Sequence, residues 1–302
     1  MKVQKSLTHQ RRTKEEMRAI NCRLPTNEFL EFHHNNYWYG NGGAYTFTNS
    51  LSFQLTKFAS TFMQIRKYAW SVKQNSEDKG LKINTIVMDM DGTITRFNLD
   101  FKEARHRMLQ ELEKMSLRAP DMTQQTSIYL MLKRLKENVD PDTFSSIRKK
   151  FYAYLQDMEV TAAQDARLYP GALETLNQLR QLPLKIGIVT NNGRAGTEMT
   201  LRRLKLNAFF DAVVTRDDCE EMKPDAGPVK KALEIMHSNP EDAIFVGDGL
   251  MDIMAAKAAA LASVAVATGP FSGEVLLQAE PDYVLGSIND LPHLLEHLDN
   301  RK

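Results

Sequence analysis

Short apolar runs alternate with amphipathic stretches over the second half of the chain. Five of these runs have the length and β-branched content of buried parallel strands: Ile83–Met88, Leu184–Thr190, Ala212–Thr215, Ala243–Val246 and Ala262–Ala267. Helical spacing of apolar residues separates the later runs, in Ala172–Gln181, Thr197–Leu206, Pro228–Met236 and Met251–Ala260. Strands that alternate with helices predict an α/β fold, with a parallel sheet covered by helices on both faces.

A block with helical spacing alone separates the first two predicted strands. Apolar residues at intervals of three and four predict one helix from about Phe101, a second from about Ile128, and a third that begins at the N-cap Asp140 and Pro141. We therefore expect an α/β core made of residues 81–98 and 166–302. Residues 99–165 are expected to form an inserted helical cap that packs over the sheet.

Residues 1–80 differ from the rest of the chain. They hold 12 Lys or Arg against 6 Asp or Glu, whereas the remaining residues hold 27 against 32. The stretch 32–50 is rich in Asn, Gly, His and aromatic residues, a composition that seldom forms a packed core. We expect a poorly ordered or accessory N-terminal extension. A basic targeting segment and an additional structural element are the alternatives.

Composition and charge exclude some classes of partner. The formal net charge is +1 and the hydrophobic fraction is 42%, with no apolar run of transmembrane length, so neither nucleic acid nor a membrane is expected as a partner. Cys22 and Cys219 match no disulfide or metal-ligand spacing. A reducing, cytoplasmic location is expected, with an organelle as the alternative if the basic extension is a targeting segment. The sequence leaves the oligomeric state open.

The run Asp89-Met90-Asp91-Gly92-Thr93 directly follows the first predicted strand. In an extended chain, residues two apart point the same way, so Asp89 and Asp91 can face one substrate. A carboxylate is a competent nucleophile toward phosphorus when nearby cations neutralise its charge, and a second carboxyl group can protonate the leaving oxygen. Gly92 has no Cβ and permits close backbone approach. The alternative is an acidic turn without catalytic function.

Three further polar features follow later strands. Thr190 and Asn191 can donate hydrogen bonds to phosphoryl oxygens, Lys223 can neutralise charge, and Asp248 with Asp252 can hold a hard cation. Taken singly, each has an ordinary structural explanation as a turn, a solvated lysine or a helix cap. Because ligands bind at the carboxyl ends of strands in open α/β sheets, their occurrence in order beyond successive strands predicts one site.

These motifs resemble a known family. Through DMDGT, IVTNN, MKP and GDGLMD, residues 81 to about 290 resemble the haloacid dehalogenase-like (HAD) hydrolase superfamily. The position of the helical insertion resembles the subfamily with a helical cap, and phosphoglycolate phosphatase-like and phosphoglucomutase-like members are the most similar. The resemblance implies a Rossmann-like parallel sheet core with an inserted helical cap domain that closes over the strand ends as a lid.

The resemblance also implies roles for individual residues. Asp89 would be the nucleophile that forms a phosphoaspartyl intermediate, and Asp91 the general acid and then base. The phosphate-binding group would comprise Gly92, Thr190, Asn191 and Lys223. Mg²⁺ would be bound by the Asp89 side chain, the Asp91 main-chain carbonyl and Asp248, with Asp252 in support.

One departure from the family pattern concerns the substrate. Relatives often place an acidic residue and a serine shortly after DGT, whereas this chain has Thr95-Arg96-Phe97-Asn98. Arg96 could bind a second anionic group of the substrate, such as a carboxylate, or it could be a solvated residue. Arg194, beside the second motif, allows the same two interpretations.

The sequence therefore predicts a Mg²⁺-dependent phosphatase, a phosphoric monoester hydrolase, acting on a small phosphorylated metabolite. The first candidate is 2-phosphoglycolate. A phosphomutase of the phosphoglucomutase-like type and a catalytically idle scaffold with this fold are the alternatives. Displacement of halide from carbon is not expected, because that reaction does not need the acid that Asp91 provides.

Overall fold

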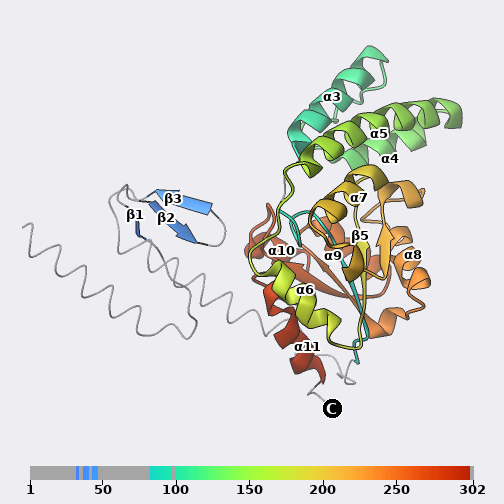
Figure 1. The fold of residues 1–302 in the computed structure, drawn as a ribbon. Helices are drawn as coiled ribbons and strands as arrows, with labels where there is room; N and C mark the ends of the chain where they lie inside the picture. The colour runs from blue at the N-terminus through green and yellow to red at the C-terminus, as the bar shows by residue number, and fades with distance from the viewer. Residues whose placement is uncertain (1–31, 34–36, 41–42, 47–81, 97–98, 300–302) are drawn as a thin grey trace, which may run out of the picture. The chain divides into compact units, whose positions relative to one another are not determined.

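The computed structural model describes residues 32–33, 37–40, 43–46, 82–96 and 99–299 (Figure 1). The chain divides into two units, Met1–Ala59 and Ser60–Lys302. The first contains an antiparallel sheet of β1 (Phe32–His33), β2 (Tyr37–Gly40) and β3 (Gly43–Thr46). The sequence pattern predicted no regular element there, because such short strands carry no detectable alternation. The other expectations for residues 1–80 fall outside the described residues.

A six-stranded sheet forms the core of the second unit, in the order β6-β5-β4-β7-β8-β9. Its strands are β4 (Thr85–Met88), β5 (Lys185–Val189), β6 (Ala212–Val214), β7 (Ala243–Gly247), β8 (Ala262–Val266) and β9 (Tyr283–Leu285). Every neighbouring pair is parallel, which confirms the predicted fold class, and the five predicted strands correspond to β4–β8. Because β4 lies between β5 and β7, the segments that follow these three strands are neighbours.

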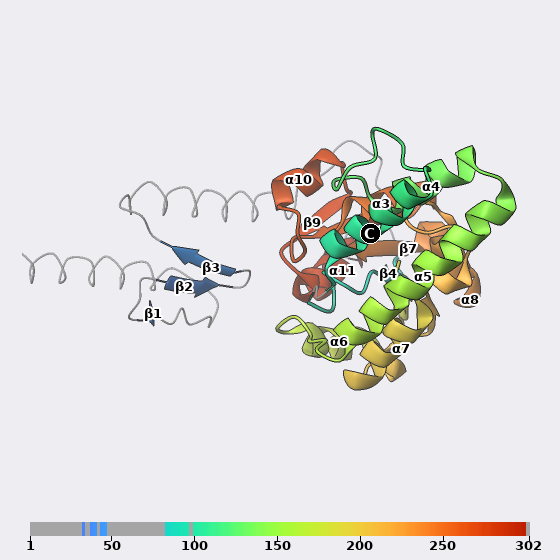
Figure 2. The same cartoon turned by 90° about the horizontal axis from the view of Figure 1, so that it is seen from above.

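Helices cover both faces of this sheet (Figure 2). In β4, Ile86 and Met88 lie in one apolar cluster together with a first set of helices. Val87 lies in another apolar cluster together with a second set of helices. The first set is α6 (Ala172–Arg180), α7 (Arg194–Arg203) and α11 (Leu291–Asp299), and the second is α8 (Gly227–Ile235) and α9 (Leu250–Ala258). Burial on both faces explains why the strands read as continuous apolar runs rather than as an alternation.

Shorter elements complete the core. They are the helix α10 (Gly273–Gln278) and the 3₁₀ helices η1 (Asn207–Phe209), η2 (Arg216–Asp218), η3 (Pro240–Asp242) and η4 (Ile288–Asp290). Leu276 of α10 packs with Val284 of β9, so that this end of the sheet has a small apolar cluster of its own.

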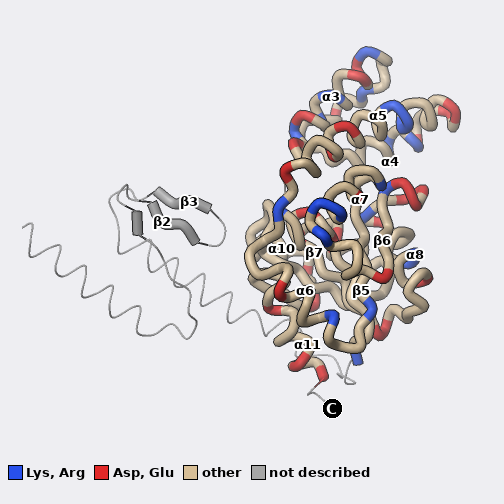
Figure 3. Tube along the Cα trace, viewed as in Figure 1, with Lys and Arg blue, Asp and Glu red and all other residues tan. Residues whose placement is uncertain are grey.

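The inserted block forms three helices, called here the cap: α3 (Phe101–Lys114), α4 (Ile128–Asn138) and α5 (Pro141–Ala163). The Asp140 carboxylate accepts a hydrogen bond from the Thr143 backbone N–H at 2.9 Å, which confirms the predicted N-cap. The three helices share an apolar cluster that includes Met108, Met131 and Phe151. Acidic and basic residues are interspersed along these helices (Figure 3), as in a solvated helical bundle.

The two segments that join the cap to the core lie side by side. Thr95 and Leu168 form an antiparallel bridge, the Arg96 N–H donates to the Arg167 carbonyl at 2.8 Å, and the Tyr169 N–H donates to the Ile94 carbonyl at 3.0 Å. The chain thus leaves the core and returns to it at one place.

Among the residues described, no helix combines the length and the apolar character needed to cross a membrane.

Candidate active site

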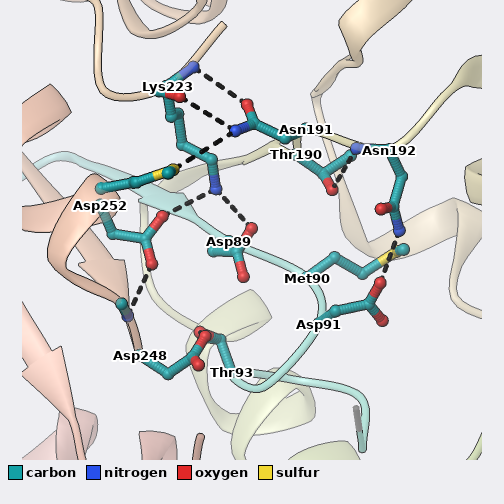
Figure 4. A network of polar contacts seen from close by, with 12 residues as sticks. Asp89, Met90, Asp91, Thr93, Thr190, Asn191, Asn192, Lys223, Asp248 and Asp252 are labelled. Carbon is teal, nitrogen blue, oxygen red and sulfur yellow. Dashed lines mark hydrogen bonds and ion pairs between the residues drawn. The ribbon is translucent and has the colours of Figure 1, made fainter. Parts of the chain in front are cut away.

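The polar motifs meet at the carboxyl edge of the parallel sheet (Figure 4). The Asp89 N–H continues the ladder by donating to the Val246 carbonyl at 2.8 Å, and the Thr190 N–H donates to the Val214 carbonyl at 3.0 Å. These two motifs therefore continue directly from the hydrogen-bonded strands β4 and β5. The sequence placed these residues together because parallel strands end at the same edge, and the structure brings them within contact of one another.

Lys223 lies between two carboxylates. Its Nζ is 2.5 Å from Asp89 Oδ1 and 2.7 Å from Asp252 Oδ1, and all three side chains are buried. Burial raises the pKa of Asp89 well above its ordinary value, although the ammonium opposes this effect. Burial alone would lower the pKa of Lys223, but Asp252 and Asp89 outweigh it and raise that pKa. Lys223 therefore remains a cation facing the predicted nucleophile.

Three carboxylates form a cluster that could hold a metal ion. Asp89, Asp248 and Asp252 each offer one oxygen, and these oxygens lie within 4.8 Å of one another. Burial, followed by the charge of Asp252, raises the pKa of Asp248 to about 7. With one lysine against three acids, the cluster has uncompensated negative charge and oxygen donors, a combination that fits a hard divalent cation.

Within this cluster the side-chain carboxylates of Asp248 and Asp252 have different surroundings. The Asp252 oxygens accept hydrogen bonds from Lys223 Nζ and from the Gly249 N–H at 2.9 Å, so Asp252 is already engaged. Asp248 accepts a bond from the Thr93 hydroxyl at 3.1 Å. Asp248 is thus better placed to bind a cation directly, and Asp252 to hold Lys223.

Gly92 has a steric reason to be glycine. Its φ is +90°, a conformation that side-chain-bearing residues rarely adopt, and a Cβ there would collide with the Asp248 carboxylate. The sequence had indicated close backbone approach to a phosphate at this position. In the structure, the residue that occupies the space beside Gly92 is Asp248.

Asp91 is held by two donors. Its Oδ1 accepts a hydrogen bond from the Thr95 hydroxyl at 2.6 Å, and its Oδ2 accepts one from Asn192 Nδ2 at 2.5 Å. Burial raises the pKa of Asp91, and the two hydrogen bonds act in the opposite direction. A carboxyl group with a raised pKa that is set apart from the Lys223–Asp89 pair suits proton donation.

The second motif supports the lysine loop. Asn191 Nδ2 donates to the Lys223 carbonyl at 3.0 Å, and the Lys223 N–H donates to Asn191 Oδ1 at 2.9 Å. The Thr190 hydroxyl accepts a bond from the Asn192 N–H at 3.1 Å. The Asn191 side chain is therefore committed to the backbone of Lys223, and only its main chain is left to meet a ligand.

Two arginines near the site differ in their surroundings. The exposed Arg96 lines a cavity of about 20 Å³ together with Asp91 and Asn192. Arg194 donates to the Asp218 carboxylate and to the Val213 carbonyl, the latter at 3.1 Å. Arg194 is thus bound by the core, whereas Arg96 faces the space beside Asp91.

Sequence reasoning missed some residues of this site. Asn192 and Thr95, the two partners of Asp91, stand beside the motifs that were singled out, so their position was a usable signal. The buried ion pair of Glu159 in α5 and Arg216 in η2 has no signal of this kind. The two residues are 57 positions apart, and each reads as an ordinary charged residue.

Comparison with known proteins places the chain in a family. Residues 86–266 match the haloacid dehalogenase-like hydrolase family. The chain is 32% identical over 220 residues to pyrophosphatase PpaX of Bacillus mycoides, with 72% of this chain and all of that protein covered.

Solved structures show the same fold. A predicted phosphatase from Clostridium acetobutylicum is 24% identical with a TM-score of 0.52, covering 71% of this chain and 99% of its own. A predicted phosphoglycolate phosphatase from Haemophilus somnus is 21% identical with a TM-score of 0.50, covering 70% of this chain and 98% of its own. The chain belongs to the haloacid dehalogenase-like hydrolase family and is an enzyme of its phosphatase class.

Proposed function

We propose that this protein is a Mg²⁺-dependent phosphatase that acts through a phosphoaspartyl intermediate on Asp89. The observation that carries the proposal is the buried Asp89 carboxylate, which lies 2.5 Å from Lys223 Nζ and belongs to a cluster of three acids. A buried nucleophile paired with a fixed cation is the arrangement that attack on a phosphate dianion requires.

In this proposal an Asp89 oxygen attacks phosphorus, and the phosphoryl group is transferred to it. Lys223 neutralises charge on both the nucleophile and the phosphoryl oxygens. The Thr190 hydroxyl and the main-chain N–H of Asn191 donate to those oxygens, whereas the Gly92 N–H already donates to the Thr95 carbonyl at 2.8 Å. Asp91 protonates the departing oxygen and then accepts a proton from the water that releases phosphate.

The same residues fit a divalent cation. The Asp89 and Asp248 carboxylates and the main-chain carbonyl of Asp91 would hold Mg²⁺, with Asp252 supporting them through Lys223. Bound Mg²⁺ would offset the negative charge that builds up during in-line transfer.

The proposed substrate is a small phosphorylated metabolite, with 2-phosphoglycolate as the first candidate. Arg96, at the wall of the cavity beside Asp91, supports a leaving group that carries a negative charge. Inorganic pyrophosphate also fits this description, and a relative of this chain is named a pyrophosphatase. A phosphomutase would use the same residues but transfer the group to a sugar hydroxyl.

The test is phosphate release from 2-phosphoglycolate, pyrophosphate, a sugar phosphate and methyl phosphate, with and without Mg²⁺. We expect Mg²⁺-dependent turnover that falls by about 10⁴-fold or more in Asp89→Asn, as for loss of a nucleophile. Asp157→Asn, a matched change at an exposed residue of α5, should leave turnover unchanged.

Turnover that survives in Asp89→Asn would contradict the mechanism. A sugar phosphate that isomerises without releasing phosphate would favour the mutase. Methyl phosphate and the sugar phosphate lack a second anionic group, so both should be poorer substrates than 2-phosphoglycolate and pyrophosphate if Arg96 selects for one.

A further inference from the structure

A buried ion pair joins the cap to the core close to the second motif. Arg216 Nη1 lies 2.6 Å from Glu159 Oε1, Arg216 Nη2 lies 3.1 Å from Glu159 Oε2, and both side chains are 3% exposed. The guanidinium also stacks on the ring of Tyr152, at 4.6 Å from its centroid. A buried pair of this kind is weak evidence for a stabilising role, because apolar residues of similar size often stabilise a protein as well.

What apolar residues could not supply are the hydrogen bonds that the pair makes to the backbone. Glu159 Oε2 accepts from the Gly193 N–H at 2.8 Å, and Arg216 Nη1 donates to the Asn191 carbonyl at 3.0 Å. The main-chain N–H of Arg216 donates to the Asn192 carbonyl at 2.9 Å. Any residue except proline would supply this last bond, so the bonds that depend on the two side chains are those to Asn191 and Gly193, on either side of Asn192.

The loop has glycines where the pair approaches it. A Cβ on Gly193 would lie 2.8 Å from Arg216 Nη2, and a Cβ on Gly196 would lie 2.7 Å from the Glu159 Cβ. Larger residues at either position would push the pair away from the loop. The local sequence is thus compatible with this close contact.

The residue at the centre of the fixed loop is Asn192, and its side chain donates to Asp91 Oδ2 at 2.5 Å. We propose that Glu159 and Arg216 are positioning residues through which the cap holds Asn192 against Asp91. This inference rests on the proposed function, in which Asp91 is the general acid. Because the ion pair of Lys223 with Asp89 does not include either residue, binding of the phosphoryl group should depend on them less than proton transfer does.

The test uses two variants. One is a double variant that combines Glu159→Met and Arg216→Met, and the other is Asn192→Ala. The apolar double variant avoids leaving a single buried charge, which would endanger folding. In both variants we expect kcat to fall by about 10- to 100-fold while KM changes by less than about threefold, because part of the general-acid contribution is lost. Glu159→Gln keeps the shape and one acceptor oxygen, so it should retain more of kcat than the double variant.

A cycle with Asn192 separates positioning from a general loss of structure. If the pair acts through Asn192, adding Asn192→Ala to the double variant should lower kcat no further. Lys136→Ala is the control, since it breaks an exposed cap–core ion pair (2.8 Å to Glu220) that does not touch this loop, and its kcat should stay unchanged. Fully additive losses, or an unchanged kcat in the folded double variant, would overturn the proposal.

A second measurement does not depend on turnover. Amide hydrogen exchange at Gly193 should become faster in the double variant, because its acceptor is gone, while Lys136→Ala should have no effect. If the unmodified protein releases no phosphate from any substrate, the proposed function fails, and exchange then decides the role of the pair by itself. Unchanged exchange at Gly193 would overturn that role.

Discussion

Asp248 shows what gathering three carboxylates does to a single residue. Burial and the neighbouring Asp252 raise its pKa from 3.8 to about 7. A carboxyl group whose pKa is raised in the folded state stabilises the fold below its unfolded pKa, and this contribution is lost as the pH rises through the folded value. The metal-free protein should therefore lose stability between about pH 4 and pH 7, and a bound cation should restore it.

We expect the Tm of the EDTA-treated protein to fall between about pH 5 and pH 8. This fall should be larger than that of Asp248→Asn by roughly 5 °C. Asparagine has no charge to desolvate, so its contribution does not change with pH. Mg²⁺ should raise the Tm of the unmodified protein at the higher pH and have less effect on the variant. If the Tm of the two proteins changed equally with pH in thermal melts, the raised pKa of Asp248 would not be the cause of the pH dependence.

Gly92 provides a steric prediction at the same scale. Gly92→Ala should displace Asp248, lower kcat by about 10-fold or more, and raise the Mg²⁺ concentration needed for half-maximal activity. Gly273→Ala is the matched control, because a Cβ there would meet nothing within 4 Å. Steady-state kinetics across a Mg²⁺ titration measures both effects, and wild-type metal dependence in Gly92→Ala would contradict the argument.

Much of the site could be predicted at the level of residues, and the exceptions have a physical reason. Asp89, Asp91 and Asp248 stand directly after strands, where the chain position itself indicates a ligand site, whereas Lys223 was singled out because it follows the other motifs in order. Asn192 was passed over in favour of Asn191, because which of two adjacent amides turns toward Asp91 depends on the local backbone. The Glu159–Arg216 contact depends on how the cap packs against the core, and no local pattern records that.

At the level of elements, the loop that carries Lys223 contacts both the cap and the carboxylates of the site. Met222 is buried in the apolar cluster of the cap, next to Met131 and Phe151, whereas the adjacent Lys223 reaches Asp89. The Tyr129 hydroxyl of α4 donates to Asp225 Oδ1 at 3.1 Å in the same loop. The cap thus holds the segment that positions the catalytic ammonium.

Met222→Ala should therefore reduce activity more than stability alone explains. Removing the buried side chain should cost about 2–5 kcal/mol of unfolding free energy. Met236→Ala is the control, because Met236 is also buried (3% exposed, against 8% for Met222), in the apolar cluster shared by α8 and α9, and lies outside the site. We expect similar losses in denaturant unfolding for both, with a fall in kcat for Met222→Ala only. A comparable fall in kcat for both variants would mean that general destabilisation is responsible.

Elements were predictable in proportion to their length and burial. The buried strands β4–β8 and the helices α6–α9 had clear apolar patterns. The strand β9 has three residues and α10 has six, too few for a period to be recognised, and α11 was also missed although it is nine residues long. β9 is placed by its pairing with β8, and α10 by the packing of Leu276 against Val284. In α11, Leu291, Leu294, Leu295 and Leu298 follow helical spacing, so this helix could have been predicted from the sequence.

At the scale of the whole molecule, the second unit contains every residue assigned to the site. The sheet, the cap and the site lie within residues 82–299, and the relative from Bacillus mycoides is matched over its full length by 72% of this chain. A chain that begins at residue 81 should therefore keep kcat within about twofold of the full protein, because every residue assigned to the site is retained.

Phosphate release from the full protein and from the shortened chain measures the role of the N-terminal extension in catalysis. The location of the two chains in the cell measures its role in targeting. A changed location with unchanged turnover would favour a targeting segment. Loss of turnover in a chain that remains folded would contradict the view that residues 1–80 are accessory to catalysis.

The paired segments at the base of the cap have an evolutionary consequence. Because Thr95 and Leu168 bridge each other, the two ends of the insertion meet at one place, and no residue between them takes part in the strand pairing of the six-stranded sheet. Such an insertion can be lengthened, shortened or exchanged without rethreading the chain. Selection could then change the recognised molecule by changing the insert, as long as the contacts from the cap to Gly193 and Met222 were kept.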